Sequence, residues 1–218
     1  MKQKNLTSLF IATTFLLAFV LWTVIISFID VKAIGPNGSK VGLATLNGAI
    51  KELIGVHFAL YVITDWLGLV PIAVALGFAI LGLIQWIKRK NILKVDFDVL
   101  ILGCFYIVVF ATYILFEYVV INRRPVFING YLEASYPSST TMLVTCVMPT
   151  TIMQLTWRIK NDALKKILTV LISLFIAFMV IGRFISGVHW FTDIFGGLLY
   201  SVGIVALYYF FCIKLTIK

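Results

Sequence analysis

The sequence predicts an all-α membrane protein, a six-transmembrane-helix bundle with one short interfacial helix after the first span. Composition is the first observation behind this prediction. Of the 218 residues, 61% are hydrophobic and only 12% are charged, which is more apolar surface than a soluble domain of this size can bury. The second observation is that six segments reach the length of about 20 apolar residues that a helix needs to cross a bilayer.

The six expected spans follow one another without a separate soluble domain, so residues 1–218 form a single membrane domain. The spans lie at roughly 7–29, 66–87, 97–121, 138–157, 166–186 and 190–213. The first span is preceded by Lys2 and Lys4 and is not followed by a small-residue cleavage site. We therefore expect it to be retained and not removed as a signal peptide.

The connection between the first and second spans is the longest of the chain. It opens with Gly35-Pro36-Asn37-Gly38, a run that favours a turn. In the segment 41–55 that follows, apolar residues at helical spacing alternate with Asn47, Lys51 and Glu52. This pattern is typical of a helix that lies in the membrane interface.

The distribution of Lys and Arg predicts which side of the membrane each end faces. The termini carry two basic residues each, and the loops after the second and fourth spans carry four each: Lys2, Lys4, Lys88, Arg89, Lys90, Lys94, Arg158, Lys160, Lys165, Lys166, Lys214 and Lys218. The positive-inside bias therefore places both termini in the cytoplasm. The net charge of +9 then belongs to cytoplasmic loops and the expected partner is the lipid bilayer, not nucleic acid. A multi-pass protein of this size without an organelle signal suits a bacterial plasma (cytoplasmic) membrane.

Ionisable residues gather where the fifth and sixth expected spans meet. Arg183, His189 and Asp193 form the pattern R-x5-H-x3-D. His189 and Asp193 are four residues apart and share a helix face. An aspartate bonded to one ring nitrogen fixes the tautomer and leaves the other nitrogen free to attack phosphorus. A histidine lying at the headgroup level by chance is the alternative, but ionisable residues at membrane depth are functional by default.

A second polar group opens the fourth expected span. In Pro137-Ser138-Ser139-Thr140 the serines favour a helix start, and the free N–H groups of a helix start bind anions. Arg123 and Arg124, just before Pro125, add guanidinium groups suited to phosphate. The alternative is a plain capped helix with two arginines snorkelling at the membrane boundary. By the sidedness above, this constellation faces out of the cytoplasm.

These patterns resemble the type-2 phosphatidic acid phosphatase superfamily of integral membrane lipid phosphatases over roughly 115–195. The family's three motifs read K-x6-R-P, P-S-G-H and S-R-x5-H-x3-D on a six-helix bundle. The resemblance implies that the arginines and the backbone of the second motif hold the phosphate. It also implies that the third-motif His forms a phospho-enzyme, that its Asp orients that His, and that the second-motif His protonates the leaving oxygen.

Residue by residue, the match assigns catalytic roles to His189 and Asp193. The phosphate contacts that it implies, together with those expected from the residues themselves, are Arg124, Arg183, Ser138, Ser139, Thr140 and Arg123. Pro125 and Pro137 also match their motifs. The chain departs from the family pattern at Glu117 (Lys in the motif), Ser139 (Gly), Thr140 (His) and Gly182 (Ser).

The change to Thr140 favours one class of substrate. A neutral hydroxyl does not supply a proton near pH 7, and the loss of a general acid costs about 10²–10⁴ in rate. An alkoxide leaving from a monophosphate, with a pKa near that of water at about 16, needs that proton. A phosphomonoester leaving from a diphosphate has a pKa of about 6 and hardly needs it. We therefore expect a lipid diphosphate, such as a polyprenyl diphosphate, in preference to phosphatidic acid.

Glu117 and His57 allow more than one interpretation. Either Arg123 takes over the role of the motif lysine while Glu117 pairs with an arginine, or Glu117 faces an amine-bearing headgroup. His57, in the outer connection, is a possible substitute for the missing acid, but an interfacial histidine is the favoured interpretation.

The favoured function is an extracytoplasmic lipid phosphatase or diphosphatase acting through a phospho-histidine, and a phosphotransferase is a variant of it. The alternative is a catalytically impaired relative that binds, senses or transports a phospholipid headgroup. A channel or structural membrane protein is a third possibility. We expect neither a metal nor a cofactor, because the two histidines are distant, the acids are scattered, and Cys104, Cys146 and Cys212 lie in apolar runs.

Overall fold

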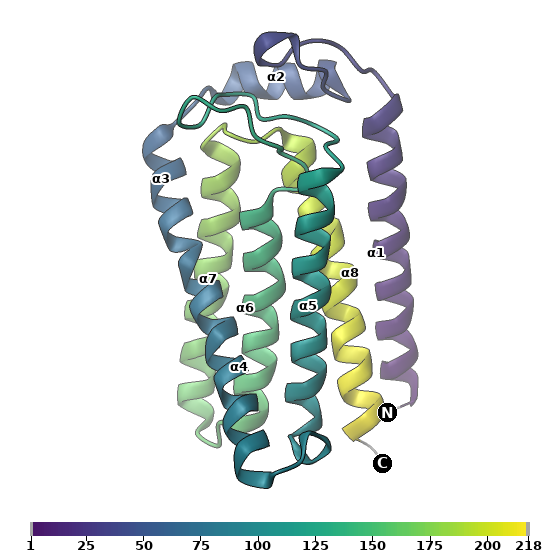
Figure 1. The fold of residues 1–218 in the computed structure, drawn as a ribbon, viewed down its shortest axis with the longest axis vertical. Coiled ribbons are helices and arrows are strands. Elements are labelled where there is room, and N and C mark those ends of the chain that lie inside the picture. Colours follow the sequence, from purple (N-terminus) through teal and green to yellow (C-terminus); the bar gives the residue numbers. More distant parts are fainter. Residues whose placement is uncertain (1, 217–218) are drawn as a thin grey trace.

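The computed structural model describes residues 2–216 and confirms the all-α class. The helices are α1 (Lys2–Phe28), α2 (Ala44–Ile54), α3 (Phe58–Leu67), α4 (Leu69–Arg89), α5 (Phe97–Tyr118), α6 (Ser139–Arg158), α7 (Asp162–Ile185) and α8 (Phe191–Thr216), with the short 3-10 turns η1 (Pro36–Gly38) and η2 (Ile92–Lys94). The long helices form one bundle. α2 lies across one end of it, while α1 begins and α8 ends at the other (Figure 1).

Among residues 2–216, five helical stretches are long and apolar enough to cross a membrane. They are Leu6–Phe28, Phe58–Arg89, Phe97–Tyr118, Asp162–Ile185 and Phe191–Ile213. The fourth expected span, 138–157, corresponds to α6, which has 20 residues but is more polar than the others. The count of six transmembrane helices therefore stays a prediction.

The second span begins earlier than the sequence predicted, at Phe58 instead of residue 66. The sequence suggested a boundary at Asp65, because a charge is costly inside a membrane helix. In the structure, Asp65 Oδ1 accepts a hydrogen bond from Arg183 Nη2 at 3.3 Å. The carboxylate is paired, and the helix accommodates it.

The polarity of α6 is satisfied inside the bundle. α6 packs against α4, α5, α7 and α8 and buries a row of hydroxyl side chains. Thr145 donates to the carbonyl of Thr141 one turn earlier at 2.6 Å and lies 2.7 Å from the Ser201 hydroxyl of α8. Thr150 likewise donates to the carbonyl of Val147 at 2.9 Å. Such bonds let polar residues lie in a membrane helix and join it to its neighbours.

A buried polar network fixes α2 to the end of the bundle. Asn47 of α2 donates from Nδ2 to Thr192 Oγ1 at 3.0 Å, and its Oδ1 accepts from the Thr192 backbone N–H at 3.3 Å. Trp22 of α1 donates from Nε1 to the Thr192 carbonyl at 3.1 Å. The helix expected within 41–55 is thus present and is tied to the first turn of α8.

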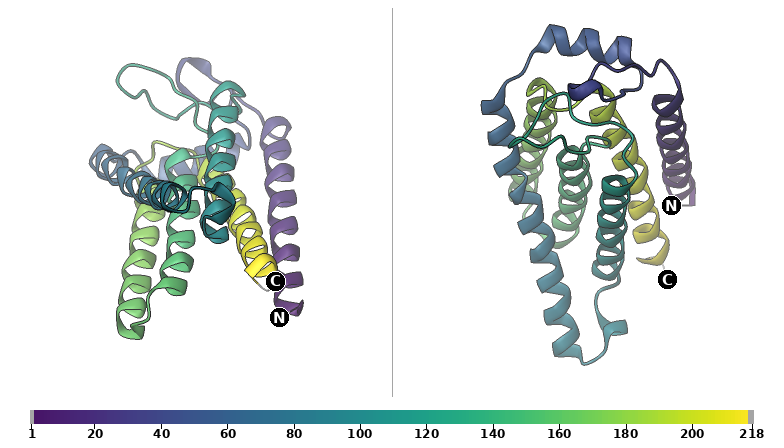
Figure 2. Two further views of the ribbon diagram at one scale, coloured as in Figure 1. Left: turned by 60° about the horizontal axis from the view of Figure 1, so that its bottom comes forward. Right: turned by 45° about the horizontal axis from the view of Figure 1, so that its top comes forward.

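The connection 119–138, between α5 and α6, crosses the same end of the bundle as α2 (Figure 2). It turns back on itself through isolated antiparallel bridges between Arg123 and Ala134 and between Ile128 and Tyr131. Because of this turn, the residues at both of its ends lie over the first turns of α6 and α8.

Candidate active site

Four segments converge at the end of the bundle that α2 covers. They are the connection 119–138, the first turn of α6, the last turn of α7 and the turn 186–190 that leads into α8. That turn depends on Gly187, which has a φ of +66° and on which a Cβ would lie 2.0 Å from the carbonyl oxygen of Gly55. The backbone N–H of His57 also donates to the carbonyl of Ser186 at 2.9 Å. The turn is therefore held against the connection between α2 and α3.

The contacts of His189 define which ring nitrogen carries the proton. Nδ1 lies 3.1 Å from the Ser135 hydroxyl oxygen and 3.1 Å from the Ser135 carbonyl. The carbonyl accepts only, and the hydroxyl donates its one proton to Asp193 Oδ2. Nδ1 must therefore be the donor in both contacts. The lone pair of the neutral imidazole is then on Nε2.

Nε2 of His189 faces a guanidinium group. Arg124 Nη1 lies 3.2 Å from Nε2 and donates to its lone pair. The expected neighbourhood of His189 and Arg124 is thus present in the structure. His189 is 5% exposed and Arg124 7% exposed, so both groups are largely withdrawn from water.

The environment of His189 favours its neutral form. His189 lies in the turn outside the membrane-spanning segments, and its pKa lies well below its ordinary value. Burial is the main cause, because it disfavours the charged form, and the positive charges of Arg124 and Arg183 add to it. The Ser135 carbonyl acts in the opposite direction, but more weakly. At neutral pH the imidazole is therefore a free base.

Asp193 does not hydrogen-bond directly to His189, contrary to the expectation from the sequence. His189 Nδ1 and Asp193 Oδ2 are 3.8 Å apart, which is too far for a hydrogen bond. The Ser135 hydroxyl bridges them. The carboxylate is instead held by the Trp190 backbone N–H at 2.9 Å and by Asn122 Nδ2 at 3.0 Å. Because Asp193 is the third residue of α8 and Trp190 directly precedes the helix, this contact also caps α8.

Arg183 is the second buried guanidinium of the site. It is 1% exposed, lies over the Tyr61 ring at 4.9 Å and contacts Asp65 at 3.3 Å and Thr64 Oγ1 at 3.4 Å. Its Nε has no hydrogen-bond partner.

Arg124 also has donor capacity to spare. Its Nε lies 3.0 Å from Glu133 Oε2, but not in hydrogen-bonding geometry. An unsatisfied buried donor costs about 1–3 kcal/mol. Each of the two guanidinium groups therefore has a donor that a bound anion would satisfy.

The start of α6 lies beside these groups. Ser138 is the N-cap residue, and its hydroxyl accepts from Thr141 Oγ1 at 3.0 Å. Its backbone N–H donates to the Asp193 carbonyl at 3.1 Å. Ser139 and Thr140 are only partly buried and line a cavity described below. Of the three residues, Ser138 is therefore used by the fold, while Ser139 and Thr140 remain open to a ligand.

The three other candidate residues lie apart from this centre. Arg123 is exposed, and its Nη1 donates to the Leu132 carbonyl at 2.9 Å. Glu117 is exposed on the last turn of α5, and the carboxylate paired with Arg124 is that of Glu133. His57 is exposed, and its Nε2 lies 2.9 Å from the Ile54 carbonyl.

Sequence reasoning missed Ser135, Asn122, Asp65 and Glu133. Ser135 and Asn122 bind the carboxylate of Asp193, whereas Asp65 and Glu133 pair with the two buried arginines. Asn122 and Glu133 adjoin motif segments, which was a usable signal. For Asp65, only its position inside an apolar run signalled that it is paired.

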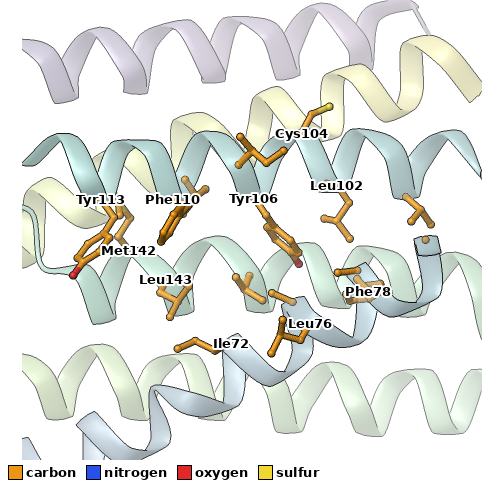
Figure 3. Close-up of a pocket in the computed structure, with 18 of the residues that line it drawn as sticks. Ile72, Leu76, Phe78, Leu102, Cys104, Tyr106, Phe110, Tyr113, Met142 and Leu143 are labelled. Atoms are coloured by element: carbon orange, nitrogen blue, oxygen red, sulfur yellow. The ribbon is translucent and has the colours of Figure 1, made fainter. Parts of the chain in front are cut away.

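A large apolar cavity of about 950 Å³ lies between α4, α5 and α6. Asp65, the charged residue of its lining, lies at one end with Ser139 and Thr140, and Tyr106 lines it farther along α5. Figure 3 shows Ile72 and Leu76 of α4 facing Phe110 and Leu143 across it. Within residues 2–216, no group of three or more His, Cys, Asp or Glu side chains is arranged so that it could hold a metal ion.

Comparison with known proteins identifies a family. The family model of the PAP2 superfamily matches residues 106–216. Among solved structures, the chain is similar to a transmembrane PAP2-type phosphatidylglycerolphosphate phosphatase from Bacillus subtilis, with a TM-score of 0.57 and 22% identity, covering 94% of this chain and 98% of that chain. No curated protein matches the chain.

Proposed function

The chain belongs to the PAP2 superfamily, and from this premise we propose that it hydrolyses a lipid diphosphate through a phospho-histidine. The proposed reaction occurs on the extracytoplasmic side of the plasma membrane of a bacterium. Family membership supports a lipid phosphatase. The single observation that supports the mechanism is the pair of contacts of the buried His189 ring: Nδ1 faces the Ser135 carbonyl, and Nε2 faces the guanidinium of Arg124.

In the proposed first step, His189 Nε2 attacks the terminal phosphorus of the diphosphate. The N–P bond forms as the P–O bond to the lipid monophosphate breaks, and that leaving group keeps the electron pair. Arg124 turns from Nε2 to the phosphoryl oxygens. Arg183 contacts the same oxygens with Nε, a donor that has no partner within the protein. The Nδ1 proton stays on the ring.

Ser135 and Asp193 stabilise the phosphorylated ring in this proposal. The imidazole becomes positively charged when Nε2 is bonded to phosphorus. Its Nδ1–H then donates to Ser135, whose hydroxyl is already polarised toward the carboxylate of Asp193. In the second step, water attacks the phosphorus, the N–P bond breaks, inorganic phosphate leaves, and the neutral imidazole is restored.

The proposed substrate is a polyprenyl diphosphate, because Thr140 stands where the family motif has its proton donor. A lipid monophosphate is a good leaving group without protonation. Thr140 packs near Gly68 at the polar end of the large cavity. The same substitution favours the alternative, a catalytically impaired relative that binds, senses or transports a phospholipid headgroup.

A phosphate-release assay on the purified protein tests the function. We expect polyprenyl diphosphate to be hydrolysed faster than polyprenyl monophosphate, and His189→Gln to abolish release from both. His57→Gln is the matched control, because it changes the other, exposed histidine, and it should leave the rate unchanged. Negligible release by the unaltered protein, equal to that of His189→Gln, would favour the binding or transport alternative. Faster turnover of the monophosphate would contradict the proposed substrate.

The proposed orientation rests on the basic loops. The 88–94 and 158–166 loops lie at the end of the bundle opposite the candidate site (Figure 1). Lys218 lies outside the described residues. An impermeant thiol reagent applied to whole cells should label Asn129→Cys, in the exposed loop near the site, and should not label Lys90→Cys. The reverse pattern would overturn the orientation.

A further inference from the structure

The apolar cavity between α4, α5 and α6 adjoins the candidate phosphate site through Asp65. Asp65 lines the cavity and accepts a hydrogen bond from Arg183. Ser139 and Thr140, which form the first turn of α6, line it as well. A molecule whose phosphate binds at Arg183 therefore has its remaining atoms at the mouth of this cavity.

Beyond this mouth, the lining is almost entirely apolar and runs along α4 and α5. Figure 3 shows that α4 crosses α5 at an angle, and Phe78 of α4 packs against the buried cluster that contains Leu102. Large apolar residues of both helices that line the cavity, such as Leu76 and Ile107, are exposed. The cavity is thus a groove that opens sideways toward lipid and narrows away from the site.

The groove is longer than one membrane leaflet. Its lining on α5 extends from Tyr113 to Val99, a separation of fourteen residues, or about 21 Å at the rise of an α-helix. One leaflet contributes about 15 Å of hydrocarbon. Val99 lies within one turn of Phe97, where α5 begins. Close packing narrows the groove at this end, because a Cβ on Gly82 would lie 3.2 Å from the Val99 side chain.

Gly103 lies in the deep half of the groove and is itself exposed. It lines the groove, and a Cβ built on it meets nothing within 4 Å. It lies ten residues from Tyr113, or about 15 Å deeper. A chain that ends short of this depth does not reach Gly103, whereas a longer chain passes it.

We propose that this groove binds a single extended prenyl chain of the substrate and that Gly103 sets the length of chain the protein accepts. This inference rests on the proposed function and deepens it. The occupant is a chain that continues past the middle of the bilayer, because the groove does. A chain confined to the outer leaflet would leave the deep half unused.

Two substitutions and two substrates test the inference. Gly103→Leu fills part of the deep half of the groove. Gly77→Leu is the matched control, since Gly77 is an exposed glycine of α4 that does not line the groove and whose Cβ also meets nothing within 4 Å. The substrates are a long polyprenyl diphosphate and geranyl diphosphate, whose extended chain of eight or so bonds measures about 10 Å.

We expect Gly103→Leu to raise the KM for the long-chain substrate tenfold or more and to leave geranyl diphosphate turnover unchanged. Unchanged geranyl turnover also shows that the variant is folded. Gly77→Leu should change neither value. If Gly103→Leu and Gly77→Leu behave alike while the unaltered protein turns over both substrates, the groove proposal is wrong and the proposed function stands. If the unaltered protein hydrolyses neither substrate, the proposed function itself fails.

Phosphatidic acid with saturated acyl chains provides the third arm. An extended acyl chain is the other hydrocarbon that the groove would accept. A Gly103→Leu effect seen with this lipid and absent with the polyprenyl diphosphate would overturn the assignment to a prenyl chain.

Discussion

The hydroxyl of Ser135 connects the imidazole of His189 to the carboxylate of Asp193. It accepts from Nδ1 at 3.1 Å and donates to Asp193 Oδ2. The carboxylate therefore influences the ring through this hydroxyl group, because Asp193 Oδ2 itself lies 3.8 Å from His189 Nδ1. This arrangement gives Ser135 a role that the sequence motifs do not assign.

Replacing Ser135 tests that role. Ser135→Ala removes the bridge but keeps the backbone carbonyl that accepts from Nδ1. A hydrogen bond to a charged group contributes about 1.5–3 kcal/mol, so we expect kcat to fall roughly tenfold to a hundredfold. Ser201→Ala, which removes another buried serine hydroxyl far along α8, is the control for general loss of packing. Equal kcat values for the two variants would remove Ser135 from the mechanism.

The charge of Arg124 should control the pH dependence of His189. Burial and the nearby guanidinium groups lower the pKa of the ring, so the active neutral form persists below pH 6.5. Removing one positive charge raises that pKa, and protonation then occurs at a higher pH. We expect the acid limb of kcat/KM to move to higher pH in Arg124→Gln and to stay in place in Arg89→Gln, which changes an arginine at the other end of the bundle.

A direct titration checks the same shift without relying on activity. The chain has two histidines, so a His57→Gln background leaves His189 as the single imidazole signal in NMR. A His189 pKa that does not rise when Arg124→Gln is added would contradict the electrostatic account.

Much of this site was predictable because its residues are charged and lie among apolar ones. Arg124, Arg183 and His189 stand out in a sequence with 12% charged residues, and each lies in the candidate site. The sequence did not reveal how the charges are paired. Glu133 rather than Glu117 pairs with Arg124, because the connection 119–138 turns back on itself and places Glu133 opposite Arg124.

The existence of the long helices was predictable from the length of the apolar segments. The residues at which these helices begin and end were harder to predict. The sequence predicts a boundary at Asp65, because the partner that neutralises it, Arg183, lies more than a hundred residues away. The sequence predicts the bounds of α6 to within one residue at each end. The sequence does not predict that α6 is the polar helix packed among four others. Its pattern alone does not distinguish threonines that face lipid from threonines that bond to Ser201 or to a carbonyl of their own helix.

Asp193 combines capping with its contact to Ser135, and two substitutions separate these roles. Asp193→Asn keeps an oxygen that accepts from the Trp190 N–H, whereas Asp193→Ala removes it. The loss of a cap costs about 1 kcal/mol, so we expect a lower melting temperature for the Ala variant than for the Asn variant. Both should lose most of kcat. An Asn variant with normal kcat would reduce Asp193 to a structural residue.

Thr140 should limit which leaving group the protein can expel. Thr140→His places an imidazole at the mouth of the groove, beside the first turn of α6, where the family motif has its proton donor. Because a general acid contributes about 10²–10⁴ in rate when the leaving group is poor, we expect a gain of a hundredfold or more on a lipid monophosphate. The rate on a diphosphate should change only a few-fold, since that leaving group departs without a proton.

Thr140→Gln controls for the added bulk and polarity and should produce no gain on either substrate. Parallel phosphate-release assays on the two lipids measure the ratio of rates directly. If Thr140→His leaves the monophosphate rate unchanged while diphosphate hydrolysis stays intact, proton donation is not what separates the two substrates. The preference for diphosphates must then arise from the binding of the second phosphate, with Arg123 and Ser139 as the next residues to test.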